Sequence, residues 1–439
     1  MKNKISVAVL ALFFLILEGS NSQLMAQPNP SPDILLITVD CLRPDHLGCY
    51  GYLKNTSPNI DKLAKKGVVF TQAIAQASWT LPSIASISTS TYPSGHKVNF
   101  WGVILSPKLP TIAEILRRRG YHNFLCSGHS NPLFEIPGFE RGFDEWVDTK
   151  KMLDSEEVNA LALQFLRENY KRKFFLWIHY MDTHDHFFNP QRDSSGSMNM
   201  LQKALNISKY DAAIAQVDKQ IGILIDELKE LKIDKNTLII ITADHGEEIC
   251  EHGICFNHGG FLWDSLIRVP LIMVWDGHLP VNKISPMQVQ HIDIASTICD
   301  LLKIKKPALF EGQSLLSIFD GRKLFPHPVF SEHQERQGDV SSGAWVYSKY
   351  SVRRDNWKLI YTLHPKGKAY ELYNLKDDPS ELNNLNRASI LTEKEKTEFE
   401  ILKQELAVWS RRKKPKVRPA ARSLDERTKE KLKGLGYLN

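Results

Sequence analysis

The chain has 439 residues, of which 42% are hydrophobic and 24% are charged, so it contains enough apolar sequence for a sizeable core. This composition argues against collagen-like, coiled-coil and disordered chains. The 56 Lys and Arg residues outnumber the 50 Asp and Glu residues, and the resulting net charge of +6 by itself suggests an anionic partner.

The first 26 residues have the layout of a secretory signal peptide. Lys2 and Lys4 precede an apolar run from Ile5 to Leu17, and small residues follow that run. The run is shorter than the ~20 apolar residues that a membrane-spanning helix needs. We therefore expect cleavage, rather than the alternative of a membrane anchor, and a secreted or periplasmic protein without stable membrane insertion.

Export also bears on the six cysteines, because an oxidising compartment permits disulfides. Cys250 and Cys255 are the nearest pair along the chain. A chain of this length does not need disulfides to fold, so buried free thiols explain the cysteines equally well. The pairing therefore stays open at this point.

Predicted strands and helices alternate over most of the chain. Continuous apolar runs predict strands at residues 33–39, 121–126, 174–180, 237–242 and 269–275. Amphipathic spacing and glycine stop signals predict helices at residues 58–66, 109–119, 155–169 and 210–231. This alternation predicts an α/β fold in which helices flank a mostly parallel sheet.

The pattern changes beyond about residue 302. Short strands with turns are expected at residues 326–375, a helix at 392–409 and a last short helix at 424–433. These features predict a smaller C-terminal α+β subdomain. The expected organisation is a signal peptide at residues 1–26, a catalytic domain at 31–322, the C-terminal subdomain at 323–410 and a basic tail with a short helix at 411–439.

Most of the excess positive charge lies in that tail. Residues 411–439 hold 11 Lys and Arg residues against three Asp and Glu residues. A solvated tail is the simpler interpretation, and docking to an anionic surface or polymer is the alternative. Nucleic-acid binding has no other support in the sequence, so we expect no nucleic-acid partner.

Acidic and imidazole side chains follow three of the predicted strands. Asp40 follows the first strand, His184 lies shortly after the strand at residues 174–180, and Asp244 and His245 follow the strand at residues 237–242. A single Asp after a strand is usually a helix cap or a turn residue. Because ligands of open α/β sheets bind outside the carboxyl ends of the strands, three such ends together predict a divalent-cation site.

A hydroxyl-rich segment at residues 78–96 is a second candidate. Thr80 is a plausible helix N-cap, with Pro82 near the first turn. A hydroxyl at a helix N-terminus meets backbone N–H groups that favour an oxyanion. A metal-coordinated hydroxyl can act as a nucleophile towards a phosphoryl or sulfuryl centre.

These motifs occur in a characteristic order that extends almost to the end of the chain. The segments concerned are residues 34–51, 56–67, 79–83 with 92–96, 182–184, 242–246, 258–259 with 268–270, 290–297, 371–379 and 435–437. In this order they resemble the sulfatase family of the alkaline-phosphatase superfamily. The resemblance implies an alkaline-phosphatase-like fold and a sulfuric ester hydrolase, with a phosphoric ester hydrolase as the alternative.

The resemblance also implies a metal centre. Asp40, Asp244 and His245 would bind one divalent cation, and Thr80 would complete the ligand set. Calcium is the usual cation of the family. The imidazole of His245 leaves manganese or zinc as alternatives, because imidazole also suits softer ions.

Catalytic and substrate-binding roles follow from the same resemblance. Thr80 would be the nucleophile, and His184 and His258 would contact the ester or protonate the leaving oxygen. His96 is a further substrate contact that we expect. The substrate would be a small-molecule or glycan ester.

The chain departs from the family pattern at three places. Thr80 stands where the family has a Cys or Ser that is oxidised to formylglycine, and Ile84 stands where the same motif has Arg. Cys41 replaces the second aspartate of the family, and no Gly-Lys-x-His segment is evident near residues 127–130. We therefore expect no formylglycine.

These departures leave the reaction open between sulfate and phosphate esters. The family favours sulfate, whereas a threonine nucleophile is typical of phosphodiesterase-like and phosphotransferase-like superfamily members. The remaining alternative is a catalytically inactive relative that binds anionic glycans.

Overall fold

The computed structural model describes residues 31–129, 136–147, 149, 151–184, 198–321, 327–337, 344–387, 390–417 and 420–421. The chain from Asp33 onwards forms one compact unit. The predicted signal peptide and the predicted helix at residues 424–433 lie outside the described residues.

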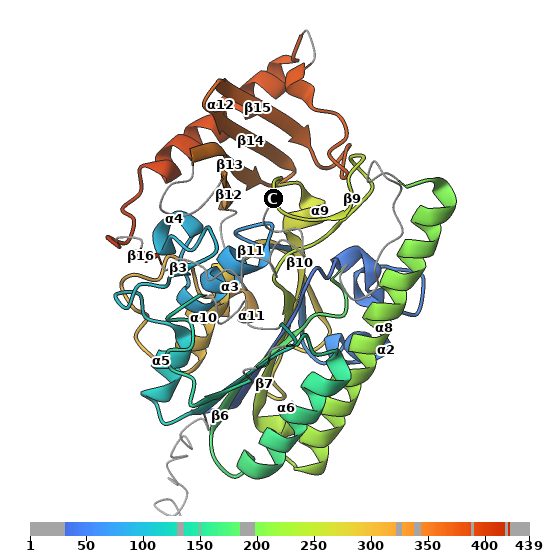
Figure 1. Cartoon of the computed structure of the whole chain (residues 1–439), viewed down its shortest axis with the longest axis vertical. Coiled ribbons are helices and arrows are strands. Elements are labelled where there is room, and N and C mark those ends of the chain that lie inside the picture. The colour runs from blue at the N-terminus through green and yellow to red at the C-terminus, as the bar shows by residue number, and fades with distance from the viewer. Residues whose placement is uncertain are drawn as a thin grey trace, which may run out of the picture. The chain divides into compact units, whose positions relative to one another are not determined.

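An eight-stranded sheet runs through the centre of this unit (Figure 1). The strand order is β11 (Lys283–Gln290), β2 (Val68–Ile74), β10 (Arg268–Val274), β7 (Thr237–Ala243), β1 (Asp33–Val39), β6 (Phe174–Tyr180), β4 (His122–Ser127) and β5 (Glu145–Trp146). Only β10 is antiparallel to its neighbours within this sheet. The predicted mostly parallel α/β fold is confirmed.

Helices cover both faces of the sheet (Figure 1). One face carries α2 (Pro58–Ala64), α6 (Ser155–Asn169) and α8 (Met200–Glu230), and the other carries α3 (Thr80–Thr89), α5 (Ile112–Arg117) and α10 (His291–Leu301). Every residue of β1, β6 and β7 is buried as a result. Burial on both faces explains why these strands are continuous apolar runs rather than alternating ones.

Some elements differ from the sequence-based expectation. β2, β11 and α10 were not predicted. β11 is an edge strand that contains Pro286 and a register shift between Ser285 and Gln288, so it lacks a continuous apolar run. α8 begins at Met200, well before the predicted start at residue 210, because Asn199 caps it through a hydrogen bond from the Gln202 N–H.

The C-terminal part forms a second, antiparallel sheet. Its four strands in order are β12 (Val329–Gln337), β13 (Ala344–Arg354), β14 (Trp357–His364) and β15 (Gly367–Asn374). The long helix α12 (Glu393–Ser410) packs against β13 and β14 (Figure 1). This is the short-strand and helix arrangement that the sequence predicts for the smaller α+β part.

Shorter elements complete the unit. They are η1 (Pro44–His46), η2 (Gly48–Tyr50), α4 (Pro93–His96), β3 (Val103–Ile104), η3 (Asp234–Asn236), β8 (Glu248–Ile249), β9 (Cys255–Asn257), α9 (Asp264–Ile267), α11 (Leu316–Phe319), η4 (Leu385–Arg387) and β16 (Ala420–Ala421). A disulfide joins Cys250 to Cys255 across the β8–β9 hairpin, whereas Cys41, Cys49, Cys126 and Cys299 are free thiols.

One side chain at the start of the basic tail, that of Arg412, packs against the rest of the protein. The Arg412 guanidinium lies over the Trp409 ring, 3.9 Å from its centroid, and its Nε donates to Glu311 Oε1 at 2.8 Å. Trp409 in turn stacks on Phe330 with 4.7 Å between ring centroids. The simpler interpretation of a wholly solvated tail is therefore wrong for Arg412, because the Glu311 carboxylate and the face of the Trp409 ring bind its guanidinium group.

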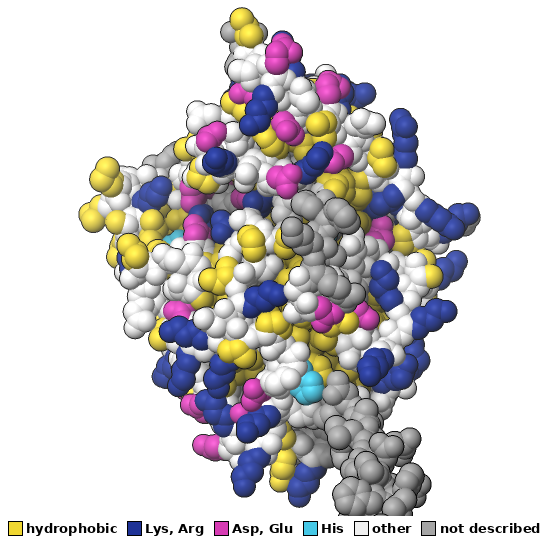
Figure 2. All heavy atoms as spheres, turned by 180° about the vertical axis from the view of Figure 1, so that it is seen from behind, with side chains coloured by type: hydrophobic (Ala, Val, Ile, Leu, Met, Phe, Trp, Pro, Cys, Tyr) yellow, Lys and Arg dark blue, Asp and Glu magenta, His cyan; other side chains and the backbone are white. Residues whose placement is uncertain are grey.

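Surface charge is mixed on the face that Figure 2 shows. Lys and Arg side chains are interspersed with Asp, Glu and uncharged groups there. In the described part of the chain, no helix combines the length and the apolar character needed to cross a membrane.

A buried lysine links the C-terminal sheet to the part of the chain that precedes β10 of the main sheet. Lys358 Nζ, in β14, lies 2.8 Å from Asp264 Oδ1 and 2.8 Å from Glu381 Oε1. Arg353 in β13 reaches the other oxygen of Asp264, with 2.8 Å between Nη1 and Oδ2. Asp264 is the first residue of α9 and follows the glycine-rich loop that carries His258. The second sheet thus helps to fix the end of that loop.

Replacing Lys358 with Met removes a fully buried positive charge, so that Asp264 and Glu381 each lose their ion pair with this lysine. We expect the free energy of unfolding to fall by about 3–5 kcal/mol, because a buried carboxylate without its partner is strongly destabilising. Urea unfolding measures the change. Lys396→Met is the control, because it breaks only a solvent-exposed pair with Glu393 and should leave the free energy of unfolding nearly unchanged. Equal stability changes in the two variants would contradict the prediction.

Candidate active site

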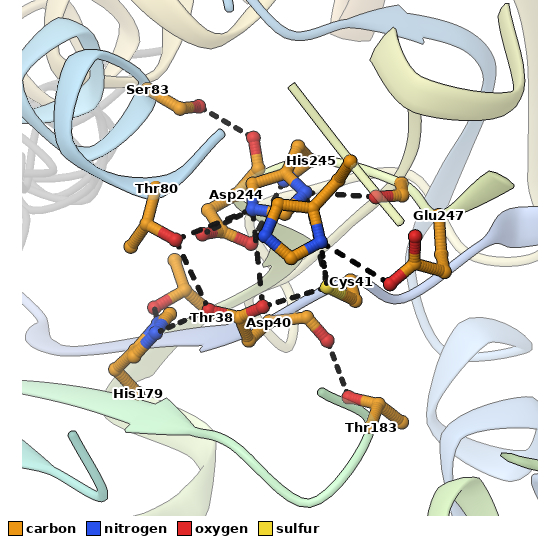
Figure 3. A network of polar contacts seen from close by, with 12 residues as sticks. Thr38, Asp40, Cys41, Thr80, Ser83, His179, Thr183, Asp244, His245 and Glu247 are labelled. Atoms are coloured by element: carbon orange, nitrogen blue, oxygen red, sulfur yellow. Dashed lines mark hydrogen bonds and ion pairs between the residues drawn. The ribbon is translucent and has the colours of Figure 1, made fainter. Parts of the chain in front are cut away.

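Strand order brings the predicted ligands together at one edge of the main sheet. β1 lies between β6 and β7, so Asp40 after β1 is adjacent to Asp244 and His245 after β7. α3 starts at Thr80 and directs this side chain towards the same point (Figure 3). Asp40, Asp244 and His245 are completely buried, and Thr80 is almost completely buried.

Thr80 lies at the side of this cluster and contacts two of its members. Its Oγ1 donates a hydrogen bond to Asp40 Oδ2 at 3.3 Å and lies 3.3 Å from His245 Nε2. His245 Nε2 is in turn 3.4 Å from Asp244 Oδ2. The four side chains predicted to bind a cation therefore do come together (Figure 3).

The helix cap differs from the prediction. Trp79, in extended conformation, is the N-cap residue of α3, and Thr80 is the first helical residue. The hydroxyl of Thr80 is therefore not used to cap its own helix. It is instead turned towards Asp40 and His245.

Burial and mutual repulsion set the charges of the two aspartates. Burial raises the pKa of Asp40, but a hydrogen bond with His179 and the charges of His184 and His245 outweigh it and hold this pKa well below its usual value. Burial and then the negative charge of Asp40 raise the pKa of Asp244. The pair therefore has one firmly ionised member and one whose ionisation depends on further positive charge.

The residues at this centre fit a divalent cation. Asp244 Oδ2 is buried and accepts no hydrogen bond from any described residue. In the described part of the chain, the ion-pair partners of Asp40, Asp244 and Glu247 are histidines. Buried carboxylates are stable only when paired or bound to metal, so this donor set of two carboxylates, an imidazole and a hydroxyl suits a cation.

Hydrogen bonds from surrounding elements orient these side chains (Figure 3). Thr38 Oγ1 lies 2.9 Å from His179 Nδ1, which leaves His179 Nε2 facing Asp40 Oδ2 at 3.4 Å. Thr183 donates to the backbone carbonyl of Asp40, and Ser83 donates to that of Asp244. Sequence reasoning identified none of these as site residues, because their role is set by packing between strands.

A second group of side chains lies beside the first. The Cys41 thiol donates to Asp40 Oδ1 at 2.9 Å and lies 3.5 Å from His258 Nδ1. His258 Nδ1 is 3.2 Å from Glu247 Oε2. The His258 ring is 4.6 Å from the His245 ring and 5.0 Å from the His184 ring, measured between centroids. The structure thus brings His184 and His258 next to the candidate metal ligands.

Glu247 follows the same predicted strand as Asp244 and His245, but the sequence assigned it no role in the site. Its side chain is completely buried, which is unusual for a glutamate, and it lies three residues after Asp244. The clustering of acidic and imidazole residues in Asp244-His245-Gly246-Glu247 was the available signal.

His96 does not join the cluster. Its Nε2 is 3.1 Å from Ser86 Oγ, and its Nδ1 accepts a hydrogen bond from the Val98 N–H at 3.0 Å. Burial lowers the pKa of His96 to about 3, so the ring is neutral. Both ring nitrogens are engaged inside the protein, and the predicted role of His96 in substrate binding does not fit this geometry.

Family models match most of the chain. Residues 32–304 match the Sulfatase family, and residues 250–408 match the family described as N-sulphoglucosamine sulphohydrolase, C-terminal. The chain is also 24% identical over 431 residues to Delta 4,5-hexuronate-2-O-sulfatase of Bacteroides thetaiotaomicron. That match covers 82% of this chain and 85% of the relative.

Solved structures show the same fold. A 2-O GAG sulfatase superposes with a TM-score of 0.70 at 21% identity, covering 89% of this chain and 95% of the other. The phosphonate monoester hydrolase of Agrobacterium radiobacter superposes with a TM-score of 0.72 at 19% identity, covering 89% and 99%. Since the Sulfatase match spans more than half of the sequence, this chain belongs to the sulfatase family of ester hydrolases.

Proposed function

We propose that this protein is an exported hydrolase that cleaves a sulfate ester with Thr80 as its nucleophile. The observation that carries this proposal is the position of Thr80 Oγ1. It stands at the first turn of α3, 3.3 Å from both Asp40 Oδ2 and His245 Nε2. We infer export from the signal-peptide layout of residues 1–26. A secreted or periplasmic location is therefore expected.

Asp40, Asp244, His245 and Thr80 are the residues that would hold the cation. Calcium is the first choice from the family, with manganese or zinc as alternatives because of the imidazole. A divalent cation at this place withdraws negative charge from the ester and lowers the pKa of a coordinated hydroxyl.

The side chains around Thr80 suit two successive displacements. Thr80 Oγ1 loses its proton to solvent by way of Asp40 Oδ2, to which it donates a hydrogen bond, and attacks the sulfur, so that an Oγ1–S bond forms and the bond from sulfur to the alcohol oxygen breaks. His258 or His184 gives a proton to the departing alcohol oxygen. Water then attacks the sulfur, the Oγ1–S bond breaks and sulfate leaves. One proton of the water returns to Thr80 Oγ1 and the other to the histidine that protonated the alcohol.

A sulfated glycan is the substrate class that the relatives support. The name of the Bacteroides thetaiotaomicron relative describes a sulfatase acting on a hexuronate sugar, and a structural neighbour is a 2-O GAG sulfatase. Each buried carboxylate of the cluster repels a sulfate group, so binding of an anionic ester also depends on the cation.

A phosphate or phosphonate ester is the second candidate. Thr80 cannot be converted to formylglycine as a Cys or Ser can, and Ile84 replaces the arginine of the sulfatase motif. A threonine hydroxyl can form a phosphothreonine in the same two displacements. The fold likeness to a phosphonate monoester hydrolase is compatible with this alternative.

Thr80→Ala should lower turnover by roughly 10³-fold or more, because it removes the attacking oxygen. Thr80→Ser keeps that oxygen and should stay within about tenfold of the unchanged protein. Initial rates with an aryl sulfate, a phosphate monoester and a phosphate diester give the measurement, and the preferred ester decides between the two candidates.

Ser88→Ala is the matched control for this series. Ser88 lies on the same helix, and its buried Oγ has no hydrogen-bond partner among the described residues. Its loss should leave turnover unchanged. If Thr80→Ala retains full turnover, Thr80 is not the nucleophile. If no ester is hydrolysed under any metal condition, the protein is the inactive relative.

Asp244→Asn should weaken divalent-cation binding by roughly 100-fold, because a neutral amide replaces a carboxylate that the fold leaves without a hydrogen bond at Oδ2. Isothermal titration calorimetry with calcium and with manganese measures the affinity. Asp276→Asn, in an exposed turn, is the control and should bind as the unchanged protein does. Equal affinities in both variants would place the cation elsewhere.

A further inference from the structure

Lys349, on β13, is a second buried lysine of the C-terminal sheet, and it forms no ion pair with any described residue. Only 9% of this residue is exposed. Its Nζ lies 3.9 Å from the centroid of the Phe261 ring and 5.2 Å from that of the Tyr347 ring. Lys358, by contrast, forms two ion pairs. A lysine is rarely buried unless its charge is paired, so Lys349 is suited to an anion that does not belong to the chain.

His333, on β12, lies opposite Lys349. The two residues are register partners in the antiparallel pair of β12 and β13, so their side chains point to the same face of the sheet. His333 is 7% exposed, and neither of its ring nitrogens has a hydrogen-bond partner among the described residues. Its Nε2 is 3.7 Å from Glu335 Oε2, which is longer than a hydrogen bond. We call Lys349 and His333 the β12–β13 pair.

Two aromatic residues attach this pair to the loop between β9 and α9. The Phe261 ring that lies against the Lys349 ammonium group belongs to that loop. Tyr347, which shares a face of β13 with Lys349, donates a hydrogen bond to the Gly260 carbonyl at 3.2 Å. A Cβ atom on Gly260 would lie only 3.2 Å from the Tyr347 hydroxyl, and its φ of 69° also favours glycine. The loop therefore approaches this part of β13 closely.

The same loop reaches the candidate active site. His258 is its first residue after β9, and Phe261 follows three residues later, a stretch that spans at most about 11 Å. The Gly259 N–H donates to the carbonyl of Ser78, two residues before Thr80, at 2.8 Å. One short loop therefore contacts both the start of α3 and the β12–β13 pair. A substrate longer than a single sugar can reach both places.

Burial weakens the charge of the β12–β13 pair but does not remove it. Burial lowers the pKa of Lys349 to about 8, against the charges of Glu371 and Glu335, so the ammonium group stays mostly protonated at neutral pH. Burial also lowers the pKa of His333, which Glu335 only partly offsets, so the neutral ring has one N–H to donate. One charged and one neutral donor match the oxygens of a sulfate group, which only accept hydrogen bonds.

We propose that Lys349 and His333 bind a second sulfate group of the substrate, on the sugar next to the one whose ester is cleaved. This inference rests on the proposed function, because it requires a sulfated glycan as the substrate. The Lys349 ammonium group forms a charge-assisted hydrogen bond with the sulfate, and the His333 N–H adds a second hydrogen bond. The pair thus selects an oligosaccharide with sulfates on neighbouring sugars over a singly sulfated one.

Two matched disaccharides test the proposal. The first carries one sulfate on its hexuronate and another on its glucosamine, and the second lacks only the glucosamine sulfate. Their affinities are measured by isothermal titration calorimetry with calcium present, in protein that carries Thr80→Ala so that the ester is not consumed. We expect the glucosamine sulfate to tighten binding roughly tenfold, the scale of a hydrogen bond to a charged group.

Lys349→Met should remove that gain. The doubly sulfated disaccharide should lose roughly tenfold in affinity, whereas the affinity of the singly sulfated one should change less than about twofold. Lys368→Met, at an exposed position of β15, is the control and should leave both affinities unchanged. Equal losses for the two disaccharides overturn the proposal, and so does unchanged binding of both or the absence of binding.

Unfolding in urea distinguishes a binding lysine from a structural one. Because Lys349 forms no ion pair with the described residues, Lys349→Met should leave the urea midpoint unchanged or raise it, unlike Lys358→Met. A clear fall of the midpoint would make Lys349 a structural counter-charge for Glu335 and Glu371, and would overturn the proposal.

The same variants separate this proposal from that of the nucleophile. Full turnover in Thr80→Ala would contradict Thr80 as the nucleophile and would leave the role of Lys349 to be decided by the two disaccharides. Their affinities would then be measured as inhibition constants against an aryl ester. A loss of the tenfold difference in Lys349→Met supports the second sulfate site in either case.

Discussion

The burial of three carboxylates at one point is the constraint on which the rest of the site depends. Asp40, Asp244 and Glu247 are all completely buried, and histidines are their ion-pair partners in the described part of the chain. Like charges in a dry interior repel one another. Histidine offsets this repulsion only when it is protonated, whereas a divalent cation offsets it at neutral pH. The balance of charge at this point therefore connects Thr80, the histidines and the Cys41 thiol.

Topology creates this concentration of charge. Because β1 lies between β6 and β7, the segments that follow these three buried strands converge, and each brings acidic or imidazole groups. α3 adds the hydroxyl of Thr80 from the opposite layer. The C-terminal sheet supports the same region from further away, since buried Lys358 holds Asp264 at the end of the loop that carries His258. Two sheets whose strands do not pair with each other thus support one candidate site.

Much of this arrangement could be predicted from local sequence. The strands at residues 33–39, 174–180 and 237–242 are continuous apolar runs because both faces of the sheet are covered. The polar residues that directly follow two of these runs include Asp40 and Asp244. β2 and β11 were missed. β11 lies at the sheet edge, where one side of the strand needs no partner and Pro286 interrupts the pattern. The hydrophobic pattern of a strand reflects how its side chains are buried, so this pattern predicts strands least well where burial is partial.

The sequence by itself determined the α/β class, the family and four candidate cation ligands, Asp40, Thr80, Asp244 and His245, because these depend on residue type and order. Only the tertiary structure decided which of those side chains meet. It separated His96 from the cluster by engaging both ring nitrogens with Ser86 and Val98. It also placed the Cys41 sulfur against His258, a residue more than two hundred positions away. Contacts of that kind arise from strand order and packing, which no local pattern encodes.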